Sequence, residues 1–123
     1  MPKTKILIIE DDQSLVKIIG EALGAEKFTV ILALEADEGL DKAILEQPTL
    51  IVLDILLPGK SGFECLKKLK ENQKTKDIPV IILSNLGQSE EIREGLSLGA
   101  VDYLVKADFA INEVVQKILK HLK

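Results

Sequence analysis

The chain contains 123 residues, of which 46% are hydrophobic, and its 16 basic and 20 acidic side chains give a formal net charge of −4. This length predicts one domain with its own core over residues 1–123, and the apolar content excludes disorder. The acidic balance argues against direct nucleic-acid binding. One cysteine cannot form an internal disulfide, and no apolar run approaches the roughly 20 residues that span a bilayer. We therefore expect a cytoplasmic domain without membrane insertion.

Short apolar runs alternate with helical patterns along the chain. Runs that lack polar alternation and are rich in Ile and Val predict strands covered on both faces, as in a parallel sheet. The predicted strands are residues 6–9, 28–33, 50–53, 80–83 and 101–105. A helical pattern follows each of them, so that a strand–helix unit occurs five times. This order predicts an open α/β sheet with right-handed crossovers.

Apolar residues at helical spacing define the faces that the five helices are expected to bury. Gly24 and Pro48 mark the ends of the first two helices, Ser61 begins the third, and the fourth covers residues 89–98 with few large apolar side chains. The residues predicted to face the core are Leu15, Ile18, Ile19, Ala22, Leu23, Leu40, Ala43, Ile44, Cys65, Leu66, Leu69, Ile92, Leu96, Leu98, Ile111, Val114, Val115, Ile118, Leu119 and Leu122. Cys65 is therefore expected to be inert core, and His121, near the end of the last helix, to be exposed to solvent.

Polar side chains follow four of the predicted strands, at the edge where open α/β sheets bind ligands. They are Glu10, Asp11, Asp12, Asp54, Ser84, Asn85 and Lys106. Two carboxylates about 4 Å apart repel by on the order of 4 kcal/mol at an effective dielectric constant of about 20. A proton, a lysine or a divalent metal must offset this repulsion, and a site made of oxygen ligands suits Mg²⁺.

The residues at this edge match the parts of a phosphoryl transfer site. Asp54 can act as the attacking carboxylate, because aspartate side chains form aspartyl phosphates. Lys106 and Ser84 can bind phosphoryl oxygens through an ion pair and a hydrogen bond. A Mg²⁺ ion held by one or two carboxylates would complete the set.

The chain resembles the receiver domain of two-component response regulators, of the stand-alone, chemotaxis-regulator-like type, over nearly its whole length. The matching residues are the Glu10-Asp11 pair, Ser84, Tyr103, Lys106, and Asp54 at the start of Asp54-Ile55-Leu56-Leu57-Pro58-Gly59-Lys60-Ser61-Gly62. The resemblance implies a flavodoxin-like (βα)5 sandwich with strand order 2-1-3-4-5, two helices on one face and three on the other. It also implies a signalling module rather than an enzyme, since such a domain catalyses only its own phosphorylation and dephosphorylation.

The resemblance further implies roles for individual residues. Asp54 would accept a phosphoryl group from a histidine kinase or phosphotransfer protein. Mg²⁺ would be held by Asp11, Asp54 and the backbone carbonyl of Leu56, with Glu10 acting largely through water. Asp12 is acidic too, but counting back from Asp54 favours Glu10 and Asp11.

The same resemblance implies how the phosphoryl signal leaves the site. Ser84 would move toward the phosphoryl group and Tyr103 would swing inward behind it. This movement would change the face formed by the fourth helix, fifth strand and fifth helix, where an unidentified downstream protein docks.

The chain departs from the family pattern at several positions. Ala107 follows Lys106, where the family usually has a proline joined by a cis peptide, so we expect a trans peptide and a rearranged loop. Asn85 replaces a small residue beside the phosphoryl site. Leu56 and Leu86 occupy positions that tune hydrolysis of the acyl phosphate, and as apolar residues they predict slow phosphate loss.

Three other functions fit the sequence less well. A pseudo-receiver that binds partners without phosphate usually lacks the acceptor, the acid pair or the lysine, and all are present here. A flavin-binding electron carrier needs a phosphate-binding loop after the first strand, where this chain has three carboxylates. A phosphohydrolase with an aspartate nucleophile normally has a second aspartate two residues later, where this chain has Leu56.

Overall fold

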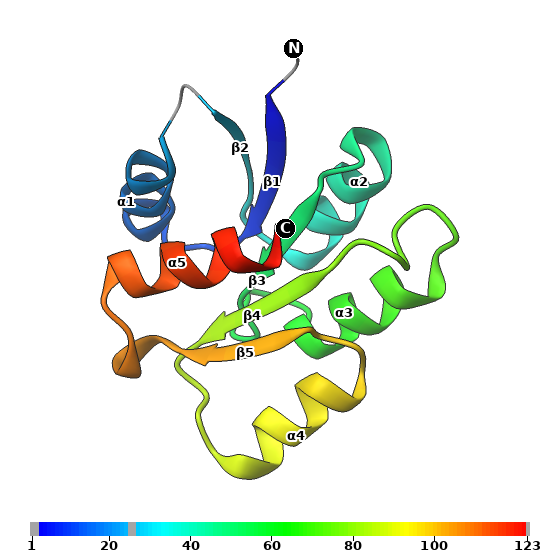
Figure 1. Cartoon of the computed structure of the whole chain (residues 1–123). Helices are drawn as coiled ribbons and strands as arrows, with labels where there is room; N and C mark the ends of the chain where they lie inside the picture. Colours follow the sequence, from blue (N-terminus) through cyan, green and yellow to red (C-terminus); the bar gives the residue numbers. More distant parts are fainter. Residues whose placement is uncertain (1–2, 25–26, 123) are drawn as a thin grey trace.

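The structure is a computed structural model that describes residues 3–24 and 27–122. Within these residues, strands and helices alternate along the chain, as predicted (Figure 1). The elements are β1 (Thr4–Ile9), α1 (Gln13–Leu23), β2 (Phe28–Ala33), α2 (Ala36–Glu46), β3 (Leu50–Leu53), α3 (Gly62–Glu71), β4 (Val80–Ser84), α4 (Ser89–Ser97), β5 (Asp102–Val105), the 3-10 turn η1 (Lys106–Asp108) and α5 (Ile111–His121).

The five strands form one parallel sheet in the order β2-β1-β3-β4-β5. Helices α1 and α5 cover one face of this sheet, and α2, α3 and α4 cover the other (Figure 1). The flavodoxin-like α/β fold and its strand order are therefore confirmed. None of the described helices has the length and apolar character needed to cross a membrane.

The core consists of two apolar layers separated by the sheet. Along β1, Ile6 and Ile8 pack toward α1 and α5, whereas Leu7 and Ile9 pack toward α2 and α3, and all four are at most 1% exposed. Burial on both faces explains why this strand has no polar alternation. The central strands are thus packed on both faces, and they position the residues that follow them.

The expected core face of α1 is partly wrong. Ile18 is 48% exposed and Ala22 is also exposed, whereas Val16, Ile19 and Leu23 are buried. Ile18 lies about 200° around the helix from Val16, so one narrow stripe cannot bury both. The apolar residues of α1 therefore cover a wider part of the helix surface than the part that is buried.

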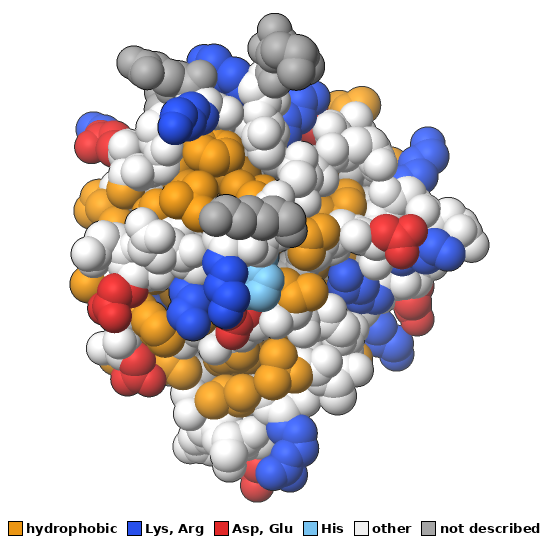
Figure 2. All heavy atoms as spheres, viewed as in Figure 1, with side chains coloured by type: hydrophobic (Ala, Val, Ile, Leu, Met, Phe, Trp, Pro, Cys, Tyr) orange, Lys and Arg blue, Asp and Glu red, His pale blue; other side chains and the backbone are white. Residues whose placement is uncertain are grey.

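Helix α4 and strand β5 also differ from expectation. Val101 precedes β5 with its side chain 44% exposed, although its N–H donates to the Val80 carbonyl at 2.8 Å. In α4, Leu96 is 45% exposed and the buried position is Gly95. Figure 2 shows hydrophobic side chains gathered at the surface between α4 and β5.

His121 is not freely solvated, contrary to expectation. Its Nε2 lies 3.1 Å from Asp102 Oδ2, and its side chain is 23% exposed. This contact joins the end of α5 to the start of β5, across 19 residues of sequence. The expectation for Cys65 is confirmed, because it is 2% exposed and burial raises the pKa of its thiol to about 12.

Candidate functional site

Three charged side chains from three different strand ends meet at the carboxyl edge of the sheet. Glu10 follows β1, Asp54 follows β3, and both carboxylates are buried, each residue being 4% exposed. Lys106, directly after β5, places its Nζ 2.6 Å from Glu10 Oε1 and 2.9 Å from Asp54 Oδ2. The predicted convergence of these residues is therefore present in the structure.

The electrostatics of this cluster follow from burial and from the shared lysine. Burial and the neighbouring Asp54 charge raise the pKa of Glu10 to about 7, although its hydrogen bond to Lys106 opposes this rise. For Lys106, burial lowers the pKa, but the hydrogen bonds to Glu10 and Asp54 outweigh it and the net direction is upward. The lysine thus stays charged, whereas the surplus negative charge of the cluster is sensitive to pH near neutrality.

Asp11 adds a third carboxylate to the same edge. One carboxylate oxygen from each of Glu10, Asp11 and Asp54 lies within 4.8 Å of the others, and Asp11 is exposed. Such a cluster of oxygen donors, open to solvent on one side, fits Mg²⁺, which retains several waters. Asp12 has a different contact: it caps α1 by accepting the N–H of Leu15 at 3.2 Å.

The loop after β3 binds Asp54 through its backbone. The Leu56 N–H donates to Asp54 Oδ1 at 2.9 Å, and the Leu56 side chain is 50% exposed. Asp54 Oδ1 is therefore held by this loop and Asp54 Oδ2 by Lys106. Gly62 permits the close approach of α3 to this loop, since a Cβ there would collide with the Asp54 carbonyl oxygen.

Ser84 and Tyr103 both bind the backbone of Leu86. Ser84, at the end of β4, is fully buried and its Oγ accepts the Leu86 N–H at 3.3 Å. Tyr103 is 8% exposed and its hydroxyl donates to the Leu86 carbonyl at 2.6 Å. The sequence singled out both side chains but gave no sign that they share a backbone partner, because a backbone group carries no residue-specific signal.

The loop after β5 has the trans peptide that Ala107 predicts, in place of the cis proline that is usual in the family. The described residues contain no cis peptide bond, so the bond between Lys106 and Ala107 is trans. The chain then forms the 3-10 turn η1, and Lys106 still reaches both carboxylates. Asn85 is exposed.

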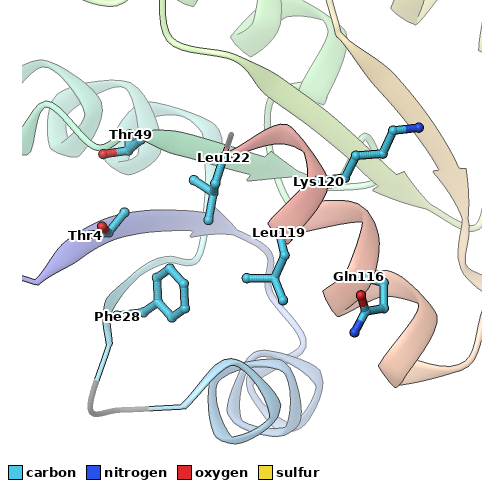
Figure 3. Close-up of a pocket in the computed structure, with 7 residues that line it drawn as sticks. All are labelled: Thr4, Phe28, Thr49, Gln116, Leu119, Lys120 and Leu122. Carbon is cyan, nitrogen blue, oxygen red and sulfur yellow. The ribbon is translucent and has the colours of Figure 1, made fainter.

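A shallow pocket of about 540 Å³ lies at the opposite, amino-terminal edge of the sheet (Figure 3). Figure 3 shows Phe28, Leu119 and Leu122 around this space, while the Lys120 side chain extends away from it. The pocket is lined by Thr4, Phe28, Thr49, Gln116, Leu119, Lys120 and Leu122. Its walls are mainly apolar and include no carboxylate, so the acidic edge is the better candidate for chemistry.

Comparison with known proteins identifies the family. The family model described as "Response regulator receiver domain" matches residues 6–119. The chain belongs to this family. As a receiver domain it is a phosphoacceptor signalling module of two-component systems rather than an enzyme acting on a separate substrate. This assignment removes the flavin carrier and the phosphohydrolase from consideration.

The receiver domain has similar relatives in sequence and structure. It is 36% identical over 115 residues to the response regulator ArlR of Staphylococcus aureus, covering 94% of this chain and 51% of that protein. The chain therefore spans about half the length of the curated relatives it matches. A receiver domain protein from Methanospirillum hungatei superposes with a TM-score of 0.88 at 28% identity, covering 98% and 94% of the two chains. The BeF3-activated receiver domain of Klebsiella pneumoniae RstA gives 0.87 at 28%, covering 98% and 99%.

Proposed function

We propose that Asp54 is the phosphoacceptor of this receiver domain. The observation that carries the proposal is the buried Asp54 carboxylate, bound by Lys106 Nζ at 2.9 Å and clustered with Glu10 and Asp11. Few structural roles require three carboxylates at one sheet edge, because their mutual repulsion is costly. A site that takes up a cation and a phosphoryl group accounts for all of them.

The proposed reaction transfers a phosphoryl group from a phosphohistidine to Asp54. A carboxylate oxygen of Asp54 forms the new bond to phosphorus as the P–N bond breaks, and the histidine nitrogen retains the electron pair and takes up a proton. Lys106 and Ser84 bind the phosphoryl oxygens. We propose Glu10, Asp11, Asp54 and the Leu56 carbonyl as the Mg²⁺ ligands, with Glu10 acting largely through water, and the ion would supply charge neutralisation at the transferring group.

The donor in this proposal is a histidine kinase or phosphotransfer protein in the cytoplasm. The phosphoryl group would then draw Ser84 toward it. Since Ser84 and Tyr103 both bind Leu86, movement of one changes the backbone that holds the other. The face formed by α4, β5 and α5 would carry this change to a downstream protein.

Intact mass spectrometry tests the acceptor directly. The protein is incubated with Mg²⁺ and a small-molecule phosphodonor, beside an Asp54→Asn variant. We expect one added phosphoryl group in the wild type, and none in the variant or without Mg²⁺. A gain of the same mass by Asp54→Asn would contradict the assignment of Asp54.

The alternative is a pseudo-receiver that binds its partner without phosphate. Because small donors can fail, beryllofluoride with Mg²⁺ serves as a second probe, as solved receiver domains have been described in BeF3-activated form. Movement of the NMR signals near Ser84 and Lys106 supports the receiver function. Unmoved signals, together with no gain in mass, favour the pseudo-receiver.

A further inference from the structure

The residue that α4 buries against the sheet is a glycine. Gly95 is buried, whereas the next residue, Leu96, is 45% exposed. Elsewhere on the same face of the sheet, α3 buries large side chains such as Leu66 and Leu69. The closest approach of α4 therefore depends on the absence of a side chain at position 95.

The space beside Gly95 is filled by one side chain from each of two neighbouring strands. A Cβ placed on Gly95 would lie 2.5 Å from Ile82 Cδ1, 2.9 Å from Tyr103 Cδ2 and 3.1 Å from Tyr103 Cε2. Ile82 in β4 and Tyr103 in β5 are register partners. Contacts this short are not tolerated by real Cβ atoms, so a methyl group at position 95 must displace at least one of these side chains.

Ile82 and Tyr103 differ in how they can move away from a methyl group at position 95. The contacting atom of Ile82 is its terminal methyl, which can move by a rotation about one side-chain bond. The contacting atoms of Tyr103 lie on one edge of a rigid ring, so they move away when the ring turns about its Cγ–Cζ axis or when the whole ring moves outward. Turning leaves the hydroxyl in place, whereas outward movement breaks the 2.6 Å hydrogen bond to the Leu86 carbonyl and exposes a residue that is now 8% exposed.

We propose that Gly95 is a positioning residue for Tyr103, the proposed switch residue: its missing side chain makes the space that the ring, already buried in this structure, occupies in its inward position. The proposal rests on the switch role of Tyr103 in the proposed function. A larger residue at position 95 would fill this space and hold the ring outward. The phosphoryl signal would then reach the Leu86 loop but not the surface between α4 and β5.

The chain carries a convenient probe of this ring. It contains one tyrosine and no tryptophan, so its tyrosine fluorescence reports on Tyr103 alone. Iodide quenching measures access of solvent to the ring. Burial, followed by the charges of Glu91 and Asp54, raises the pKa of the phenol, so an outward ring should also titrate at lower pH.

The experiment compares Gly95→Ala with two matched glycine variants, without phosphodonor. Gly39→Ala introduces an equally close contact, 2.5 Å from Ile9 Cδ1, but in α2. Gly20→Ala adds a methyl in α1 with only an ordinary 3.7 Å contact to Val30. We expect a severalfold rise in iodide quenching and a lower phenol pKa in Gly95→Ala, with both matched variants like the wild type. Unchanged quenching in a folded Gly95→Ala protein would overturn the proposal.

A second variant covers the case in which Gly95→Ala does not fold. Ile82→Val removes Cδ1, so in the Gly95→Ala/Ile82→Val protein the ring of Tyr103 is the remaining close neighbour. We expect this double variant to fold, with raised quenching. Wild-type quenching would assign the conflict to Ile82, and failure to fold would show that the ring cannot move outward; either result contradicts the proposal. Phosphorylation by the small donor and the response to beryllofluoride with Mg²⁺ are measured in parallel, because the absence of both in every protein would refute the acceptor and leave the Gly95 result intact.

Discussion

The carboxylate cluster and helix α4 are held in opposite ways. The cluster is tied by two short ion pairs that join the ends of β1, β3 and β5, and its carboxylates are buried. Helix α4 has one fully buried residue, Gly95, its Ile92 is only partly buried against the core, and its Leu96 is 45% exposed. Ion pairs and buried strands hold the carboxylate cluster in place. Helix α4 is held mainly by the close contact of Gly95 with Ile82 and Tyr103.

The difference matches what each region is proposed to do. A phosphoryl acceptor needs its groups at fixed distances, which buried strand ends supply. A signalling surface must change with the small free energy that one new charged group provides, which favours an element of low local stability.

Removing the lysine of the cluster should give the largest effect. Lys106→Met leaves the buried carboxylates of Glu10 and Asp54 without their cation, and we expect a loss of about 3 kcal/mol in unfolding free energy at pH 8. The matched variant is Lys60→Met, whose exposed ion pair with Asp37 should matter little. Urea unfolding measures both. Equal losses of unfolding free energy in the two variants would mean that the buried ion pairs stabilise the fold no more than an exposed one.

The acidity of Glu10 predicts a smaller, pH-dependent effect. Its pKa is raised from 4.5 to about 7, so between these values the folded protein binds more protons than the unfolded chain. The contribution of Glu10 to stability is therefore fully present below pH 4.5 and is lost as pH rises toward 7. We expect a loss of about 2 kcal/mol across this window without Mg²⁺.

Unfolding in urea at pH 5 and pH 8, in wild type and Glu10→Gln, isolates this contribution. The variant should lack the loss, and Mg²⁺ should restore part of the wild-type stability at pH 8 by binding the folded state. Parallel pH dependence in the two proteins would contradict the raised pKa of Glu10.

The smallest effect concerns the residue between the two regions. Leu86 bears an apolar side chain on the loop between β4 and α4, and its backbone binds Ser84 and Tyr103. Replacing it by glutamate offers a carboxylate that can position an attacking water, so the phosphorylated protein should lose phosphate roughly fivefold faster. The half-life of phosphorylated wild type and of Leu86→Glu is measured beside Leu86→Met. Equal half-lives would show that Leu86 does not slow hydrolysis.

Most of the fold was predictable because the central strands are buried on both faces. Runs such as Leu50–Leu53 have no polar alternation, and that pattern directly predicts a covered parallel strand. The strand order came from the resemblance to receiver domains. The prediction of which helix face is buried was partly wrong. Ile18 of α1 is an example, because an exposed isoleucine and a buried one look the same in the sequence.

The site was predictable where charged side chains follow strands, and unpredictable where contact depends on backbone or on empty space. Glu10, Asp54 and Lys106 each follow a predicted strand, and they were expected to converge if those strands are neighbours in the sheet, as they do. The shared Leu86 backbone and the space at Gly95 have no counterpart in composition or periodicity. The contact of His121 with Asp102 was missed for a similar reason, since it depends on how α5 ends beside the start of β5.

The ion pairs of Lys106 also depend on assembly of the sheet. Lys106 is separated by 96 residues from Glu10 and by 52 from Asp54, and each strand pair of the sheet is parallel and needs a crossover between its strands. The lysine therefore joins its carboxylates only after β5 has docked on β4. A nascent or partly unfolded chain carries the proposed acceptor Asp54 without its cation, so under this proposal phosphate uptake requires that β1, β3, β4 and β5 have assembled.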